Sequence, residues 1–234
     1  MAWNKYYIFV KSPKVTDIGE ILSKLNLSQY NPTKVVPLHY SNKPETLFTG
    51  FYNDNLIIVH PDLPFQFFHD TSTETEKLFI DTFPNSEIAA LIENSTVGFF
   101  SYAIIDKGQK IRMKDGSDGD IYHDEGQLLP EEKEVLSEKI FQDDEIEEMK
   151  ENGMSDDEVD AMIKFEASWR VPNRLTKRYL GESVGSIDTN KVMLTMYEWQ
   201  KRTHNIGFGA MAAFPIYTDR PVRYSASVTG HPDF

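Results

Sequence analysis

The sequence contains no cysteine, so it can form neither disulfide bonds nor thiolate metal sites. It also lacks an uninterrupted apolar segment of the ~18 residues that a membrane-spanning helix requires. The first residues have none of the features of a signal peptide, which starts with basic residues and continues with a long apolar region. These absences predict a cytoplasmic protein that does not associate with membranes.

Basic residues are scarce relative to acidic ones. The 234 residues include 24 lysines and arginines against 37 aspartates and glutamates, which gives a net charge of −13. Because phosphate groups repel such a chain, the composition argues against binding to nucleic acids or to an anionic membrane surface. A hydrophobic fraction of 40% is sufficient for the core of one large domain or of two small ones.

The negative charge is concentrated in one stretch. Residues 131–160 contain 14 acidic residues and three lysines, and so carry −11 of the net −13. A solvated helix face without a partner is one interpretation of such a stretch. The other is a docking surface for a basic protein, as in immunity-type inhibitors of basic toxins, because charge of one sign speeds encounter with the opposite sign. The candidate partner-binding residues are Asp143, Asp144, Glu147, Glu148 and Glu151.

The first 128 residues are dominated by strand patterns. Residues 96–106 are apolar on both faces, which is typical of a central strand covered on both sides. We therefore expect helices on each face of the sheet, or a helix on one face and a second lobe on the other. Asn53-Asp54-Asn55 predicts a hairpin turn. The predicted strands are 5–10, 46–52, 56–60, 87–93, 96–106 and 109–113, and the predicted helices are 17–27 and 73–83.

From Pro130 onward the pattern becomes helical. Helices are predicted at 143–151, from a capping box at Ser155 to about residue 169, and at 173–180 after Pro172. Residues 188–202 are too densely apolar to separate helix from strand, and their length favours a helix.

The predicted fold is therefore α+β, with a central, mainly antiparallel sheet flanked by helices. Its expected parts are a sheet-rich lobe at 1–128, an acidic helical lobe at 129–202 packed on it, and an extended C-terminal segment at 203–234. These parts can also form a single domain.

A match to the G-x-S-x-G motif of serine hydrolases occurs at Gly181–Gly185, with Ser183 as the candidate nucleophile. The motif requires a preceding strand and a following helix, whereas the preceding residues have helical spacing. Gly181 then fits a glycine that ends a helix. A small serine hydrolase, with Asp219 and His231 as the later acid and base, is the alternative function.

An acidic, glycine-rich segment offers oxygen ligands for a cation, with Asp115, Asp118 and Asp120 as candidates. Their spacing differs from that of a helix-loop-helix calcium site, so a solvated hairpin loop is favoured. His123 lies beside two acidic residues, Asp124 and Glu125, and the histidine spacings do not fit a helical zinc site. The sequence thus predicts no cofactor.

The leading hypothesis from the sequence is a protein-binding module without catalytic activity. A structural or regulatory subunit with no site of its own is the third possibility.

Overall fold

The computed structural model describes residues 4–41 and 43–199 of the chain. Contacts within the chain group residues 1–200 into one compact unit and residues 201–234 into another. The predicted extended segment at 203–234, with Asp219 and His231, lies outside the described residues.

A nine-stranded sheet forms the centre of the first unit, with the strand order β2-β9-β3-β4-β1-β5-β6-β7-β8. Every neighbouring pair of strands is antiparallel. This confirms the α+β class and the antiparallel sheet that the sequence predicts. The strands are β1 Asn4–Val10, β2 Tyr30–Pro37, β3 Thr46–Tyr52, β4 Asn55–Val59, β5 Ile88–Asn94, β6 Phe99–Asp106, β7 Gln109–Ser117, β8 Asp120–Gly126 and β9 Met193–Trp199.

The predicted hairpin between β3 and β4 is confirmed. Asn53 and Asp54 have φ angles of 48° and 60°, a conformation that these two residue types tolerate well. Strands β5, β6 and β7, at the ranges predicted as strands, form an antiparallel meander with a turn at Lys107 and Gly108 between the last two.

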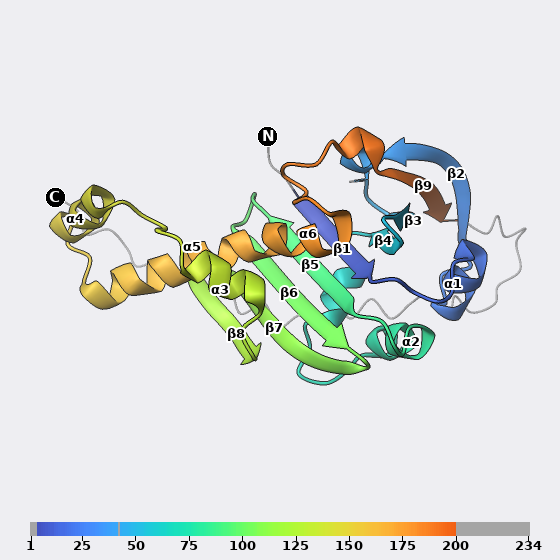
Figure 1. Cartoon of the computed structure of the whole chain (residues 1–234), viewed down its shortest axis with the longest axis horizontal. Coiled ribbons are helices and arrows are strands. Elements are labelled where there is room, and N and C mark those ends of the chain that lie inside the picture. The colour runs from blue at the N-terminus through green and yellow to red at the C-terminus, as the bar shows by residue number, and fades with distance from the viewer. Residues whose placement is uncertain (1–3, 42, 200–234) are drawn as a thin grey trace, which may run out of the picture. The chain divides into compact units, whose positions relative to one another are not determined.

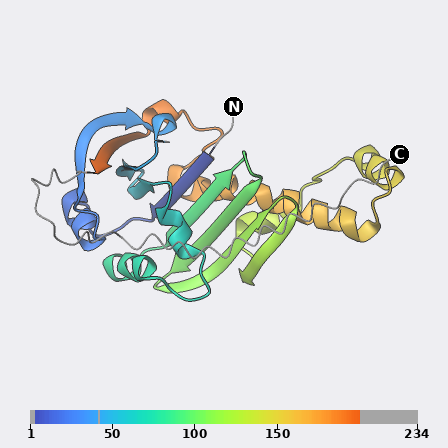
Figure 2. The same ribbon diagram turned by 180° about the vertical axis from the view of Figure 1, so that it is seen from behind.

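Helices cover both faces of the sheet, as expected (Figure 1). Helices α3, α5 and α6 lie on one face, and Figure 2 shows η2 and α2 on the other. None of the helices within the described residues is long and apolar enough to span a membrane. The helices are α1 Ile18–Lys24, α2 Glu74–Thr82, α3 Pro130–Leu136, α4 Asp143–Glu151, α5 Asp156–Leu175 and α6 Lys177–Leu180, with short 3-10 helices η1 Leu38–Tyr40, η2 Leu63–Phe67 and η3 Thr189–Lys191.

Two apolar cores result, one on each face of the sheet. Neighbouring residues Ile8 and Phe9 of β1 are both fully buried, but they point into different cores because side chains alternate along a strand. Phe9 stacks on Tyr179 of α6, with ring centroids 4.8 Å apart. In the other core, Phe79 of α2 packs edge-on against Phe67 of η2.

The helix favoured for residues 188–202 is wrong, because Met193–Trp199 forms strand β9 between β2 and β3. Leu194 is fully buried whereas Met193 is 44% exposed, which is the alternation of a strand. The sequence hides this alternation because the second face of β9 also carries large apolar side chains, among them Tyr197 and Trp199.

Helix α5 also differs from the prediction, since it continues through Pro172 to Leu175 instead of ending near residue 169. A proline within a helix removes one backbone hydrogen bond. Burial of Val171 and Leu175 against the sheet compensates for that loss. Helix α6 follows directly, after Thr176.

Candidate functional site

The acidic stretch divides into two parts that the sequence does not distinguish. The carboxylates of α3 and the residues after it are neutralised by arginines from β7, α5 and α6. Glu131 forms a bidentate pair with Arg178, with both N–O distances 2.6 Å. The remaining pairs are Glu132 with Arg112, and Glu134 and Glu138 with Arg174.

Glu132 lies in the interior, where its carboxylate accepts four hydrogen bonds. Arg112 donates through Nε and Nη2 at 2.8 and 2.6 Å, the Tyr102 hydroxyl at 2.8 Å and the Leu129 N–H at 2.8 Å. Burial and the neighbouring Glu132 carboxylate raise the pKa of Tyr102, so this hydroxyl remains a donor. The cluster attaches α3 to the sheet and has a structural role.

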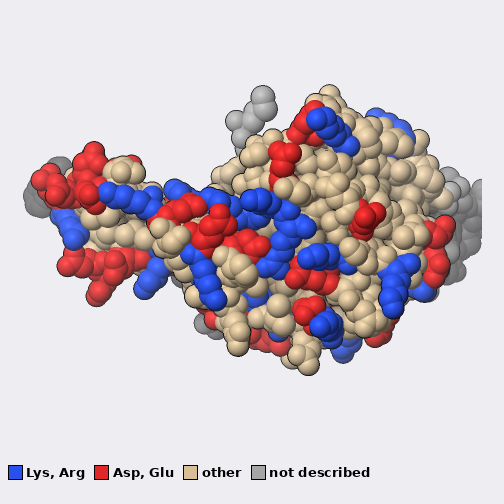
Figure 3. Space-filling model, viewed as in Figure 1, with Lys and Arg blue, Asp and Glu red and all other residues tan. Residues whose placement is uncertain are grey.

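Residues 143–160, which we call the acidic arm, have a different environment. They comprise α4 and the first turns of α5, and they contain ten acidic residues and one lysine. Helix α4 buries none of its side chains. Figure 3 shows Asp and Glu side chains gathered over α4, whereas acidic and basic side chains alternate over α3 and α5.

The five predicted partner-binding residues all lie on α4, and all five are exposed. Asp143 pairs with Lys139 at 2.8 Å. The other four, Asp144, Glu147, Glu148 and Glu151, form no ion pair within the described part of the chain. The structure thus places the predicted residues on one exposed helix and leaves most of their charge uncompensated.

Both helices of the arm have well-formed N-termini. The Gln142 N–H donates to Glu145 at 2.6 Å, and the Ser155 N–H donates to Glu158 at 2.7 Å. Backbone hydrogen bonding from Ser155 lowers the pKa of Glu158. The predicted capping box at Ser155 is therefore confirmed.

Ser183 lies in a turn after α6. Gly181 ends that helix with a φ of 84°, the left-handed conformation of a C-terminal glycine. The Ser183 hydroxyl donates to the Ser186 hydroxyl at 3.0 Å. Because a helix precedes Ser183 and a turn follows it, these residues do not form the strand-to-helix turn of a nucleophile elbow.

The candidate cation ligands lie on a tight β7–β8 hairpin, whose two strands take up most of the segment expected to be a solvated hairpin loop. Asp115 is buried within β7, Asp118 is at the turn with a φ of 53°, and Asp120 begins β8. Within the residues that the structure describes, there is no cluster of three or more His, Asp or Glu side chains that could hold a metal ion. The prediction missed β8 because this exposed edge strand has a polar sequence without apolar alternation.

The hairpin instead pairs Asp115 with His123, its partner in the strand register. The Asp115 carboxylate accepts a hydrogen bond from the His123 backbone N–H at 3.0 Å and another from the ring Nδ1 at 2.9 Å. Burial raises the pKa of the Asp115 carboxyl. On the other side of the ring, Nε2 lies 4.0 Å from Asp70 Oδ1.

Asp70 lines a cavity of about 220 Å³ between β7, β8 and the segment before α2. We call it the β7 cavity. Its wall is polar and consists of His69, Asp70, Ser72, Lys110, Arg112, Met113, Glu125 and Gly126.

Buried Glu76 of α2 fixes two of these wall residues. Its Oε1 accepts a hydrogen bond from the Ser72 hydroxyl at 2.9 Å, and its Oε2 lies 2.9 Å from the Lys110 ammonium. The contact between Glu76 Oε2 and Lys110 is an ion pair without hydrogen-bond geometry. Lys110 also donates to the His69 carbonyl at 3.3 Å. No sequence pattern indicates this cavity, because its residues come together only in the folded chain.

Comparison with known proteins gives no match: no protein-family model, no curated protein and no solved structure is significantly similar to this chain. The function is therefore inferred from the geometry and charge of the chain itself.

Proposed function

We propose that the chain binds a basic protein through the acidic arm. The observation that carries the proposal is the contrast between α3 and α4. The carboxylates of α3 have arginine partners, whereas Asp144, Glu147, Glu148 and Glu151 of α4 are exposed and unpaired within the described residues. A partner with lysines or arginines would supply the missing opposite charge.

The close spacing of carboxylates on α4 lowers the stability of this helix. Asp144 and Glu148 are four residues apart on the same helix, as are Glu147 and Glu151, and like charges at this spacing repel. A basic surface would relieve that repulsion on binding, which favours the complex. Helix α4 is already formed and capped, so little conformational entropy is lost when it binds.

Inhibition of a basic protein, as in immunity-type inhibitors, is the specific form that we propose. The arm has the charge to attract such a target at long range and to reject acidic proteins. The proposal is inferred from the charge of the arm and not from a relative of known function.

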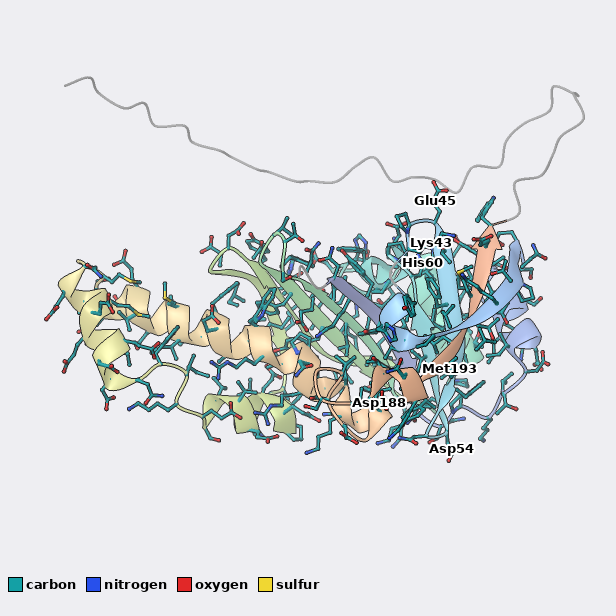
Figure 4. The ribbon with its side chains drawn as sticks, turned by 90° about the horizontal axis from the view of Figure 1, so that it is seen from above. Lys43, Glu45, Asp54, His60, Asp188 and Met193 are labelled. Carbon is teal, nitrogen blue, oxygen red and sulfur yellow. The ribbon has the colours of Figure 1, made fainter. Side chains whose placement is uncertain are left out.

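A variant of the arm with four fewer carboxylates, which we call the charge-reduced arm, tests the proposal. The variant carries Asp144→Asn, Glu147→Gln, Glu148→Gln and Glu151→Gln, which preserve side-chain size. The matched control removes four exposed carboxylates elsewhere, through Asp54→Asn, Asp81→Asn, Asp118→Asn and Glu182→Gln. Figure 4 shows Asp54 at the end of the β3–β4 hairpin, away from α4.

The measurement has two steps. Proteins recovered from the native host at low and high salt are identified by mass spectrometry, and the basic protein enriched at low salt is purified. Its dissociation constant is then measured with the native chain and with both variants. We expect the charge-reduced arm to weaken binding about tenfold or more and to reduce the salt dependence, while the control changes neither. Equal weakening by the two variants would show that net charge alone acts, and would refute a specific role for the arm.

A further inference from the structure

Asn152 lies in the turn between α4 and α5, and Gly153 follows it. No other asparagine in the sequence is followed by glycine. The side-chain amide of an asparagine reacts with the backbone nitrogen of the next residue, and this reaction is fastest before glycine, which has no Cβ to hinder the approach. The chain therefore has one position with the intrinsic chemistry for spontaneous deamidation.

The structure leaves both residues open to solvent. Asn152 and Gly153 are exposed, and the space beside the Gly153 Cα is empty of other described residues. The Asn152 amide forms no hydrogen bond within the described part of the chain. In contrast, the amide of Asn94, which precedes a serine, donates to the Tyr6 hydroxyl and accepts from the Thr96 N–H, each at 3.1 Å. The Asn152 side chain can thus rotate toward Gly153, whereas that of Asn94 is held.

Backbone hydrogen bonds oppose the reaction while α4 is intact. The Gly153 N–H donates to the Lys150 carbonyl at 3.0 Å, and the ψ angle of Asn152 is 5°. The last turn of α4 must open before the Gly153 nitrogen can turn toward the Asn152 side chain. That opening costs little, because α4 has nine residues, buries no side chain and carries repelling carboxylates at Glu147 and Glu151.

We propose that Asn152 is a site of spontaneous deamidation, in which the Gly153 nitrogen attacks the Asn152 side chain when the last turn of α4 opens. The nitrogen loses its proton and forms a bond to Asn152 Cγ. The bond between Cγ and Nδ2 breaks, ammonia leaves, and a five-membered imide ring remains. Water then opens the ring at one of its two carbonyls. Opening at Cγ gives aspartate, and opening at the backbone carbonyl gives isoaspartate, in which the main chain runs through the former side chain.

Both products alter the acidic arm. Each adds one negative charge at the C-terminal end of α4, where the helix dipole disfavours negative charge. Isoaspartate also adds one carbon to the main chain. This displaces the Gly153 N–H from the Lys150 carbonyl and the Met154 N–H from the Met149 carbonyl. The reaction therefore makes the arm more negative and loosens the turn between its two helices.

Incubation of the full chain in ¹⁸O-labelled water at neutral pH tests the proposal, because ring opening adds ¹⁸O to the residue that reacts. Digestion and mass spectrometry locate the label, and a synthetic peptide of residues 147–158 gives the rate without the fold. We expect label at Asn152, in aspartate and isoaspartate, at a rate within about tenfold of that of the peptide, and no comparable label at Asn94. Absence of label at Asn152 once the peptide has fully converted, or equal labelling of Asn94, would overturn the proposal.

Glu148→Lys tests the role of helix opening. It replaces repulsion with Asp144 by attraction and places a positive charge in the last turn of α4. We expect labelling of Asn152 to slow about twofold or more in the full chain, and not in a peptide with the same substitution. The matched control, Glu182→Lys, makes the same charge change at an exposed residue after α6 and should leave the rate unchanged. Equal slowing by the two variants, or an unchanged rate in Glu148→Lys, would disprove reaction through the opened turn.

Discussion

At the scale of single residues, Glu132 illustrates how a buried charge holds two elements together. Its carboxylate bonds to Arg112, Tyr102 and the Leu129 N–H. Among the described residues, Glu132→Ala leaves the Arg112 guanidinium with only Asp124 as its ion-pair partner. We expect the free energy of unfolding to fall by about 3–5 kcal/mol, as measured by urea denaturation.

Glu134→Ala is the control for that measurement. Glu134 is on the same helix and also pairs with an arginine, Arg174, but it is exposed. An exposed pair contributes about 1 kcal/mol or less. Similar losses in the two variants would mean that the interior cluster adds nothing beyond a surface ion pair.

His60 provides a prediction on pH. Its Nδ1 accepts hydrogen bonds from the Asp62 and Leu63 N–H groups, so Nε2 donates to the Tyr30 hydroxyl at 2.9 Å. Burial lowers the pKa of His60 from 6.5 to about 4. Between pH 6.5 and 4, His60 therefore binds a proton in the unfolded chain but not in the folded chain. The free energy of unfolding falls as the pH drops through this range.

His60→Asn isolates this effect, because the amide does not titrate and its oxygen can replace Nδ1 as acceptor. We expect the native chain to lose up to about 3 kcal/mol more than the variant between neutral pH and pH 4, by urea denaturation. Parallel pH profiles of the two proteins would show that folding does not shift the pKa of His60.

At the residue scale, the sequence predicts where charged side chains lie but not which residues they contact. The exposed carboxylates of α4 follow from a helix that is acidic on nearly every side. The contact between Asp115 and His123 depends on the register of β7 and β8, and β8 has no apolar alternation to reveal it. Likewise, no local pattern indicates that Glu132 is buried, because its partner Arg112 is distant in sequence.

At the scale of elements, β9 provides the clearest test of the fold. Leu194 is fully buried and Met193 is 44% exposed, although the two are adjacent. Leu194→Ala should reduce the free energy of unfolding by about 2–5 kcal/mol, as for other buried leucines. Met193→Ala should cost much less, since its side chain is already partly in water. Urea denaturation of both variants checks this, and equal costs would contradict the strand.

The elements that the sequence predicts well are those with unambiguous local signals. The hairpin at Asn53 and Asp54 and the capped start of α5 are examples, because turn and cap chemistry is local. Strand β9 and the continuation of α5 through Pro172 were missed, because burial against distant elements decides them.

At the scale of the whole molecule, helix α4 of the acidic arm contributes no buried side chain to the core. The variant with the charge-reduced arm therefore removes no core packing. We expect its free energy of unfolding to match that of the native chain within about 0.5 kcal/mol, or to exceed it slightly because repulsion is reduced. Urea denaturation provides the check, and a large loss would mean that the four carboxylates stabilise the fold.

The position of β9 has a consequence for how the protein is made. In the described sheet, β2 pairs with β9 alone, and β9 also covers one side of β3. As the ribosome extends the chain, β2 emerges early but has no neighbour until residues 193–199 follow much later. The growing chain therefore presents β3 as an open strand edge until β9 emerges, and such edges invite pairing with other chains. Completion of the sheet is then a late step, in which β9 inserts between β2 and β3.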